Sequence, residues 1–281
     1  MNHNRWMTSL YEFIKNLRVD ELALPSSHNA GVDRRVVDPV GGHWAACQDD
    51  SFAFQLRQGI RVLDLRVVDD SYRKDIGGKK PTYRFTEVIR CKHVLPGRSV
   101  DNCVAAVRSF AEENRNELVI LDIHSYDAGL KLNDPVGRFK QKLNALAHLL
   151  IPPAASSLTL AQIKQSYPGK NVIICWGGGG GAYWNTIRHL WTGQNLTSQA
   201  ELVSFIINKA RNSVPAAALT SLSATVYSLA SGPVRLKRDS PVWAEVFHPQ
   251  HRVFNIINAD FFQNTGVVEG CIELNKIRSG R

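Results

Sequence analysis

Hydrophobic and polar positions along the chain follow two alternating patterns. Short apolar runs with strand character are each followed by turn or polar residues. These runs cover residues 21–25, 60–68, 86–94, 117–125, 171–176, 224–230 and 252–262. Stretches with helical periodicity lie between several of them, at 99–117, 134–150 and 198–212. Strands that alternate with helices favour parallel pairing, and the Val, Ile and Leu content of the strands predicts burial on both faces.

Polar side chains gather where these apolar runs end. They are His28 and Asn29 after the first run, Asp64 and Arg66 in the second, His93, Asp122 and His124 in the next two, then Trp176 and Asp260. In a barrel of parallel strands, such ends meet at one rim, where enzymes of this architecture build their sites. The pattern therefore predicts the α/β class and a distorted TIM-like (β/α) barrel, with residues 1–281 as a single domain.

Composition and charge narrow the function classes. Hydrophobic residues make up 44% of the 281 residues, enough for a sizeable core. No window has the apolar length of a membrane span and no secretory signal is visible, so we expect a soluble chain and make no prediction of its compartment. The formal charge of +9 favours an anionic partner, either nucleic acid or a membrane surface. No nucleic-acid recognition motif is present, so we expect no nucleic-acid binding.

The cysteine pattern excludes two further classes. The five cysteines are widely spread and form no C-x-x-C pair, which argues against a zinc knuckle and against a scaffold held by disulfides. We expect most of them to be buried thiols.

Two histidines at different strand ends are suited to phosphodiester cleavage by general acid and base. One imidazole takes a proton from an attacking hydroxyl, the other protonates the leaving oxygen, and a guanidinium stabilises the phosphoryl charge. The residues that supply these roles are His28, His93, Arg66, Asp64 and Asp260. Asp64 and Arg66 are two positions apart and so share one face of their strand. The alternative is that they form a structural ion pair while the histidines only cap strands.

At this point the motifs support a family resemblance. The segments "LPSSHNAGV", "QLRQGIRVLDLRV", "CKHVLPG", "ELVILDIHSYD" and "FNIINADFF" resemble, in order and spacing, the X-domain of phosphatidylinositol-specific phospholipases C, most closely the small single-domain type. The resemblance implies a distorted TIM-like barrel that cleaves phosphatidylinositol to diacylglycerol and inositol 1,2-cyclic phosphate. It implies that His28 is the general base and His93 the general acid, with Asp260 supporting His28.

Members of this family differ in whether they need a metal ion, and the sequence resembles both kinds. Asn29 is similar to the residue after the first histidine in calcium-dependent members, whereas Asp64 with Arg66 is similar to the metal-independent ones. At the position of the calcium-binding glutamate stands His124, a poor calcium ligand. A guanidinium at Arg66 would supply the charge that a metal otherwise provides, so we expect no cofactor. The alternative is Ca²⁺ held by Asn29, Asp64 and Asp122.

Further residues are candidates for contact with the substrate or the membrane. For the substrate these are His124, Trp176, Tyr183 and Trp184, although the segment "CWGGGGGAYW" is most simply a flexible loop. For the surface of a phosphatidylinositol-containing membrane or micelle they are Lys79, Lys80, Arg235, Lys237 and Arg238. We expect a monomer.

The sequence is also compatible with two other functions. One is a related barrel phosphodiesterase acting on glycerophosphodiesters or sphingomyelin-type lipids, against which the Asp-x-Arg at 64–66 counts. The other is a catalytically silent module that binds inositol lipid.

Overall fold

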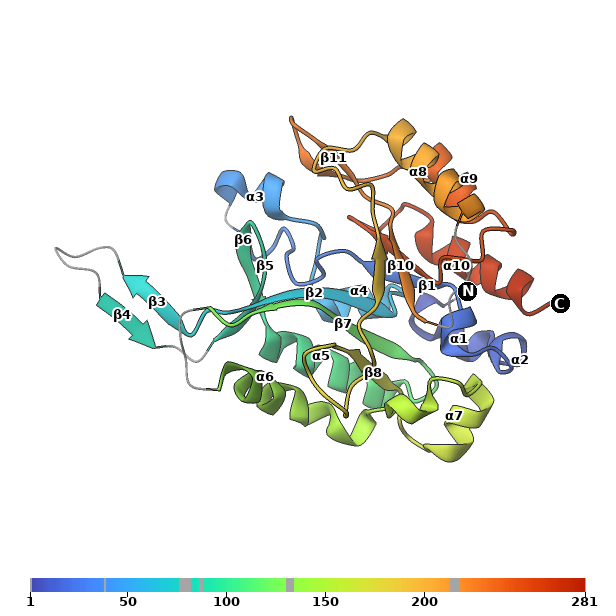
Figure 1. Ribbon diagram of the computed structural model, residues 1–281, viewed down its shortest axis with the longest axis horizontal. Helices are drawn as coiled ribbons and strands as arrows, with labels where there is room; N and C mark the ends of the chain where they lie inside the picture. The colour runs from blue at the N-terminus through green and yellow to red at the C-terminus, as the bar shows by residue number, and fades with distance from the viewer. Residues whose placement is uncertain are drawn as a thin grey trace.

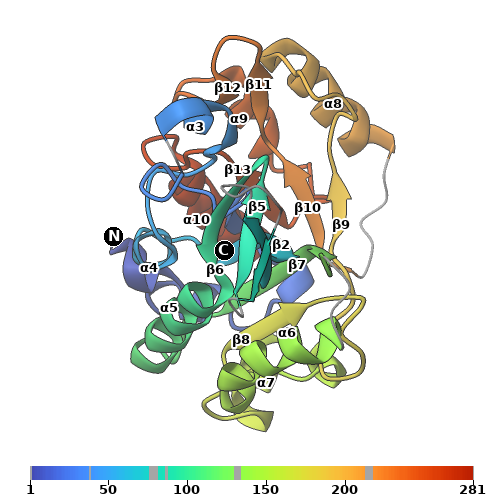
Figure 2. The same ribbon diagram turned by 90° about the vertical axis from the view of Figure 1, so that its left-hand side faces the viewer.

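Seven parallel strands surround the centre of the molecule. The computed structural model describes residues 2–37, 39–75, 82–85, 88–129, 134–212 and 218–280. The strands are β1 (Leu24–Ser27), β2 (Val62–Asp69), β7 (Val119–Asp127), β8 (Val172–Cys175), β9 (Arg188–Leu190), β10 (Thr220–Ser223) and β13 (Ile256–Ala259). Their order is β8-β7-β2-β1-β13-β10-β9, and every neighbouring pair is parallel. Figure 2 looks onto the resulting ring of strands. Within the described residues no ladder joins β8 to β9, so hydrogen bonds do not close the barrel.

A hairpin extends this sheet beside the second strand. It consists of β5 (Ile89–His93) and β6 (Leu95–Ser99), and β5 pairs antiparallel with the last residues of β2, Val67 opposite Cys91. The hairpin pairs only with the end of β2, beyond the residues of β2 that pair with β1, so it adds an antiparallel extension to the ring. It also carries His93 to the same rim as the end of β2.

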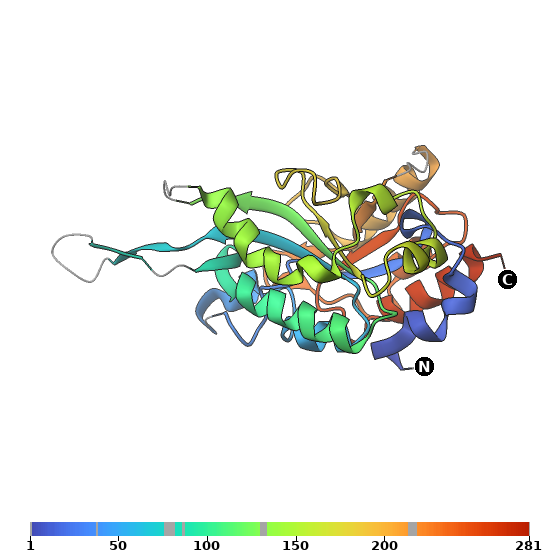
Figure 3. The same ribbon diagram turned by 90° about the horizontal axis from the view of Figure 1, so that it is seen from below.

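Helices cover the outside of the strands, as Figures 1 and 3 show. They are α1 (Trp6–Ser9), α2 (Tyr11–Ile14), α3 (Pro39–Ala45), α4 (Phe52–Arg57), α5 (Val100–Glu113), α6 (Pro135–Leu143), α7 (Leu160–Ser166), α8 (Gln199–Asn212), α9 (Pro241–Val246) and α10 (Val267–Arg278). Short 3₁₀ helices span His3–Arg5, Val19–Glu21, Asn144–Leu149 and Pro153–Ala155. Two small antiparallel hairpins lie outside the ring: β3 (Tyr72–Asp75) with β4 (Thr82–Phe85), which projects from one end in Figure 1, and β11 (Val226–Ser228) with β12 (Gly232–Val234).

A buried ion pair connects the N-terminal segment to the amino ends of β2 and β7. Arg61 and Glu117 are both fully buried, with 2.6 Å between Nη2 and Oε2. Glu117 also accepts hydrogen bonds from the backbone N–H groups of Met7 and Thr8, and Arg61 donates to the carbonyl oxygen of Asn4. Because every charge in this network has partners, its cost of burial is offset.

The predicted barrel is confirmed, and most predicted elements are present. The three stretches with helical periodicity form α5, α6 and α8, and six of the seven apolar runs overlap a barrel strand or β5. The run at 224–230 instead forms β11, which lies outside the ring, and the barrel strands β9 and β10 had no predicted counterpart. All five cysteines are free and buried. In the described part of the chain, no helix is both long and apolar enough to cross a bilayer.

Candidate active site

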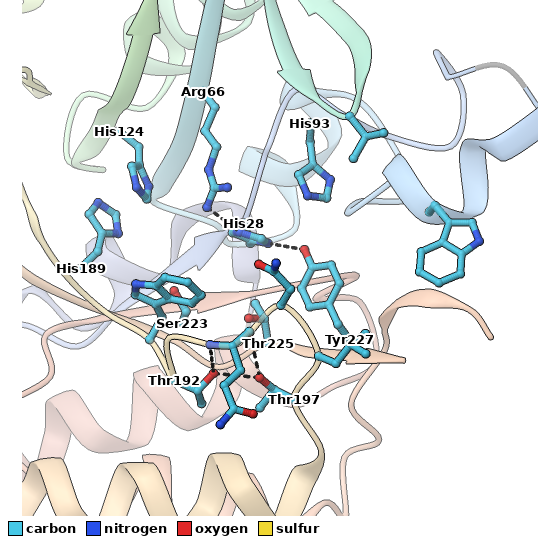
Figure 4. Close-up of a pocket in the computed structure, with 16 residues that line it drawn as sticks. His28, Arg66, His93, His124, His189, Thr192, Thr197, Ser223, Thr225 and Tyr227 are labelled. Atoms are coloured by element: carbon cyan, nitrogen blue, oxygen red, sulfur yellow. Dashed lines mark hydrogen bonds between the residues drawn. The ribbon is translucent and has the colours of Figure 1, made fainter. Parts of the chain in front are cut away.

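A pocket of about 510 Å³ opens at the carboxyl ends of the barrel strands. Figure 4 shows the side chains that converge on it from separate strands. Its walls are formed by His28, Arg66, His93, His124, His189 and Tyr227, together with the segment 191–197 and residues Trp44, Val94, Ser223 and Thr225. Four of the residues predicted from the sequence, His28, Arg66, His93 and His124, therefore line a single cavity.

His28 lies between a carboxylate and a guanidinium, which defines its tautomer. Its Nδ1 is 2.8 Å from Oδ1 of Asp260, and its Nε2 is 3.1 Å from Nη2 of Arg66. A carboxylate only accepts and a guanidinium only donates. Nδ1 therefore carries the proton, and Nε2 presents a lone pair towards the pocket. This is the form in which an imidazole can take a proton from a substrate hydroxyl.

His93 faces His28 across the pocket, with 6.2 Å between the ring centroids. Its Nδ1 lies 2.9 Å from the carbonyl oxygen of Ala45, so Nδ1–H donates there and Nε2 is the atom available to a ligand. Burial lowers the pKa of His93 below its ordinary value, and the bond to Ala45 only partly opposes this effect. Among the described residues no carboxylate forms an ion pair with the His93 ring, in contrast to His28.

Asp64 and Arg66 point to the same side of β2 but have different surroundings. Asp64 is fully buried, and its Oδ2 accepts a hydrogen bond of 2.8 Å from Nδ2 of Asn258. Burial alone would raise the pKa of Asp64, but His124, Arg66 and His28 outweigh it and hold the pKa well below its ordinary value. Asp64 is therefore a permanent negative charge beneath the pocket, whereas Arg66 reaches into the pocket itself.

Asn29 occupies the turn that follows β1, with φ at 46°. Asparagine is among the few residues that adopt this left-handed conformation readily. Its Nδ2 lies 3.2 Å from Nε2 of His28 and 3.4 Å from Sγ of Cys47, and this sulfur in turn lies 3.4 Å from Nδ1 of His93. Asn29 and Cys47 thus fill the space between the two histidines without adding a charge, because burial raises the pKa of the Cys47 thiol well above its ordinary value.

Three residues of the site were not anticipated from the sequence. His189 lies on β9, which at three residues is too short to produce a recognisable pattern. Cys47 follows α3 and not a strand, and Tyr227 belongs to the run that was expected to form a barrel strand. The hydroxyl of Tyr227 lies 3.5 Å from Nδ1 of His28, and burial raises the pKa of this phenol, so it stays protonated.

The predicted aromatic contacts with substrate do not fit their positions. Trp176 packs against Tyr126, Phe139 and Tyr183, with ring centroids 4.9 to 5.8 Å apart. Trp184 is buried, and its Nε1–H donates to the carbonyl oxygen of Ile151 at 2.9 Å. Trp176, Tyr183 and Trp184 are all absent from the wall of this pocket.

The pocket rim instead carries exposed apolar side chains from other segments. Trp44, Val94, Trp191 and Leu196 all line the mouth, and their exposed fractions are 37%, 71%, 52% and 42%. Val94 adopts φ of 60°, which is rarely accessible to a β-branched residue. Apolar residues gathered around a cavity entrance mark an interaction surface.

The predicted basic contacts with a membrane have mixed surroundings. Arg235 donates to the carbonyl oxygens of Phe261 and Gln263 and pairs with Asp49, so it holds the loop after β13 in place. Lys237 and Arg238 are exposed, and Arg238 faces Glu269 at 3.6 Å. Lys79 and Lys80 lie outside the described residues.

The proposed calcium ligands have separate partners in the structure. Asp64 and Asp122 are opposite each other in the register of β2 and β7, but the amide nitrogen of Asn29 lies next to His28 and Cys47. Among the described residues, two sets of potential metal donors come within 4.8 Å of one another: Asp122 with His124 and His189, and His28 with Cys47 and Asp260.

Comparison with solved structures relates this architecture to one class of proteins. Phosphatidylinositol-specific phospholipase C of Listeria monocytogenes superimposes with a TM-score of 0.68 over 98% of this chain and 99% of that one, at 15% identity. A mutant of the Staphylococcus aureus phosphatidylinositol-specific phospholipase C gives a TM-score of 0.67 over 96% and 98% of the two chains, at 13% identity. The fold is thus the distorted TIM-like barrel of these enzymes.

Sequence comparison agrees with this structural likeness. No protein-family model matches the chain. It is 24% identical over 323 aligned residues to PI-PLC X domain-containing protein 2 of Mus musculus, an alignment that covers 98% of this chain and 88% of the mouse protein. The human protein of the same name is 28% identical over 44% of each chain. The resemblance to the phosphatidylinositol-specific phospholipase C X-domain family is confirmed.

Proposed function

We propose that the protein cleaves phosphatidylinositol to diacylglycerol and inositol 1,2-cyclic phosphate by general acid and base catalysis. The observation that carries this proposal is the pair of histidines in one pocket. The hydrogen bond to Asp260 keeps the proton of His28 on Nδ1, so Nε2 has a lone pair that can accept a proton. His93 lies across the cavity, and its Nδ1–H donates to the carbonyl oxygen of Ala45.

The proton transfers follow from these tautomers. Nε2 of His28 removes the proton of the inositol 2-hydroxyl while that oxygen attacks phosphorus, and Asp260 stabilises the imidazolium that forms. Protonated His93 donates from Nε2 to the diacylglycerol oxygen as its bond to phosphorus breaks. The proton count balances without water, because one histidine gains the proton that the other loses.

Arg66 is suited to bind the phosphate. Its Nη2 lies 3.1 Å from Nε2 of His28, so a phosphoryl oxygen held by this guanidinium would lie beside the attacking hydroxyl. A guanidinium stabilises charge on phosphoryl oxygens through a geometry that matches them. This arrangement supports catalysis in which Arg66 supplies the positive charge and no metal is required.

The rim supports a lipid as the substrate. Trp44, Val94, Trp191 and Leu196 surround the entrance, and amphipathic aromatic side chains are favoured at the boundary between lipid and water. A diacylglycerol portion would remain among these side chains while the polar head group reaches the histidines. The net charge of +9 would add attraction to an anionic membrane surface.

The test measures products from phosphatidylinositol in mixed micelles, with and without chelator. We expect cyclic inositol phosphate in both conditions, and its loss in His28→Ala and His93→Ala. The control is His148→Ala, because His148 is an exposed residue paired with Glu112 outside the pocket. Turnover of a choline or glycerol diester only after metal addition would instead identify the related diesterase. Lipid binding without cleavage by the wild type would identify a silent binding module.

A further inference from the structure

A second cluster of ionisable side chains lies on the pocket wall away from His93. Figure 4 shows His124 and His189 side by side on the opposite side of Arg66 and His28 from His93. Asp122 and His124 come from β7 and His189 from β9, so the cluster bridges the open side of the barrel. Donor atoms of all three residues lie within 4.8 Å of one another. The proton transfers proposed above use none of them.

Several polar atoms of this cluster have no hydrogen-bond partner. Among the described residues, Oδ1 of Asp122 and Nδ1 of His189 have neither a hydrogen bond nor an ion-pair contact. The Asp122 side chain is almost completely buried, with a relative exposure of 1% for the residue. Buried polar atoms are nearly always paired, because leaving one unpaired is costly in free energy. A carboxylate oxygen of Asp122 that is this deeply buried and has no partner is available to bind a ligand.

The two carboxylates at this cluster favour the binding of a cation. Asp64 and Asp122 are direct neighbours in the register of β2 and β7, and both are buried. The two imidazoles stack with 3.8 Å between their centroids, so two positive rings at this distance would repel each other. A neutral imidazole is the form that ligates metals.

The spacing of the donors matches metal coordination. Nε2 of His189 lies 3.1 Å from Oδ2 of Asp122, close to the donor separation of about 3.3 Å that tetrahedral zinc sites have. Oδ1 of Asp64 lies 3.3 Å from Nδ1 of His124, which leaves Nε2 of that ring as the ligand atom. A carboxylate behind a ligating histidine is the usual outer partner in metal sites.

We propose that Asp122, His124 and His189 bind a divalent first-row transition metal ion such as Zn²⁺, with its remaining coordination positions open to the pocket. Two imidazoles and one carboxylate select such an ion over Ca²⁺ or Mg²⁺, which prefer oxygen donors. The ring planes differ by 25°, so binding tilts one ring until both lone pairs point at the ion. The ion would lie beside Arg66, where oxygen atoms of a bound ligand can reach it.

The other donor cluster is less suited to this role. Nδ1 of His28 already forms a hydrogen bond to Oδ1 of Asp260, and the Cys47 thiol is buried with a raised pKa. A metal there would have to displace the proton from each of these groups. Co²⁺ bound at this second cluster could be recognised by its spectrum, because a cobalt thiolate absorbs strongly in the near ultraviolet whereas cobalt with only nitrogen and oxygen ligands does not.

The test is metal titration of the full chain after removal of bound metal with chelator. Calorimetry with Zn²⁺ is expected to show one site, and Co²⁺ is expected to give weak visible bands without a thiolate band. His124→Ala, His189→Ala and Asp122→Asn should each weaken binding by at least about 100-fold, and Asp64→Asn by about 10- to 100-fold. His148→Ala and Cys47→Ser should bind as the wild type does.

Circular dichroism and thermal unfolding would show that each variant is folded. His124→Gln and His189→Gln serve as replacements for any alanine variant that is not. Absence of a stoichiometric site in the wild type, equal affinity in the ligand variants, or a thiolate band lost in Cys47→Ser would overturn the proposal. Because these titrations contain no lipid, failure here would leave the proposed cleavage reaction standing.

Discussion

Asn29, the uncharged residue between His28 and His93, offers a direct test of their roles as general base and general acid. We predict that Asn29→Asp moves the pH profile of kcat/KM to higher pH. Aspartate has the same shape as asparagine and also tolerates the left-handed backbone at this position, where φ is 46°. The substitution therefore adds one negative charge with little other change.

The magnitude follows from the contacts of Asn29. Its Nδ2 is separated from Nδ1 of His93 by Cys47, with 3.4 Å on each side of the sulfur. A carboxylate oxygen would thus lie within about 7 Å of the His93 ring, where a unit charge contributes about 2 kcal/mol at an effective dielectric constant of about 20. This free energy corresponds to a change of more than tenfold in the protonation equilibrium of His93.

The direction in which the pH profile moves follows from the lowered pKa of His93. Burial lowers the pKa of His93, so in the wild type little of the general acid is protonated at neutral pH. A carboxylate raises the pKa of His93 and keeps the acid protonated to higher pH.

The assay is kcat/KM for phosphatidylinositol in micelles across pH 5 to 9.5. On the alkaline side of the wild-type optimum, we expect Asn29→Asp to be faster by up to about tenfold. Asn29→Gly is the matched control, because it removes the amide but keeps the backbone conformation and adds no charge. A high-pH limb that stays in place, or that moves to lower pH in a folded Asn29→Asp protein, would exclude His93 as the general acid.

Three further substitutions test the fold and the rim. Arg61→Ala should lower the free energy of unfolding by about 3–5 kcal/mol in urea titrations, because it leaves Glu117 charged and buried; a loss below 1 kcal/mol would contradict this account. Gly31→Ala should cost about 1–3 kcal/mol, since an added Cβ would lie 2.4 Å from Cβ of Cys91; unchanged thermal stability would refute the close contact. Trp191→Ala should weaken sedimentation with anionic vesicles while leaving hydrolysis of a soluble inositol phosphodiester unchanged, and equal losses in both assays would place Trp191 in the catalytic step.

Much of the site was predictable because its residues sit at the ends of recognisable strands. His28, Arg66, His93 and His124 follow or end apolar runs, and parallel strands bring such ends together. Trp176 also ends a strand, yet it points away from the pocket. Whether a side chain at a strand end faces the cavity or the covering helices depends on the register and twist of the sheet, which a linear pattern does not contain.

The class of fold, the family resemblance and the two histidines could be predicted from the sequence, because apolar periodicity and local motifs carry that information directly. The neighbours that surround these residues could not be predicted in this way, because they come from distant parts of the chain. His189 comes from a strand of three residues, Cys47 from the segment after α3, and Tyr227 from a hairpin outside the ring. Their proximity to the histidines results from packing between segments far apart along the chain, so distance and burial, and with them the pKa of His93, arise only once the barrel is assembled.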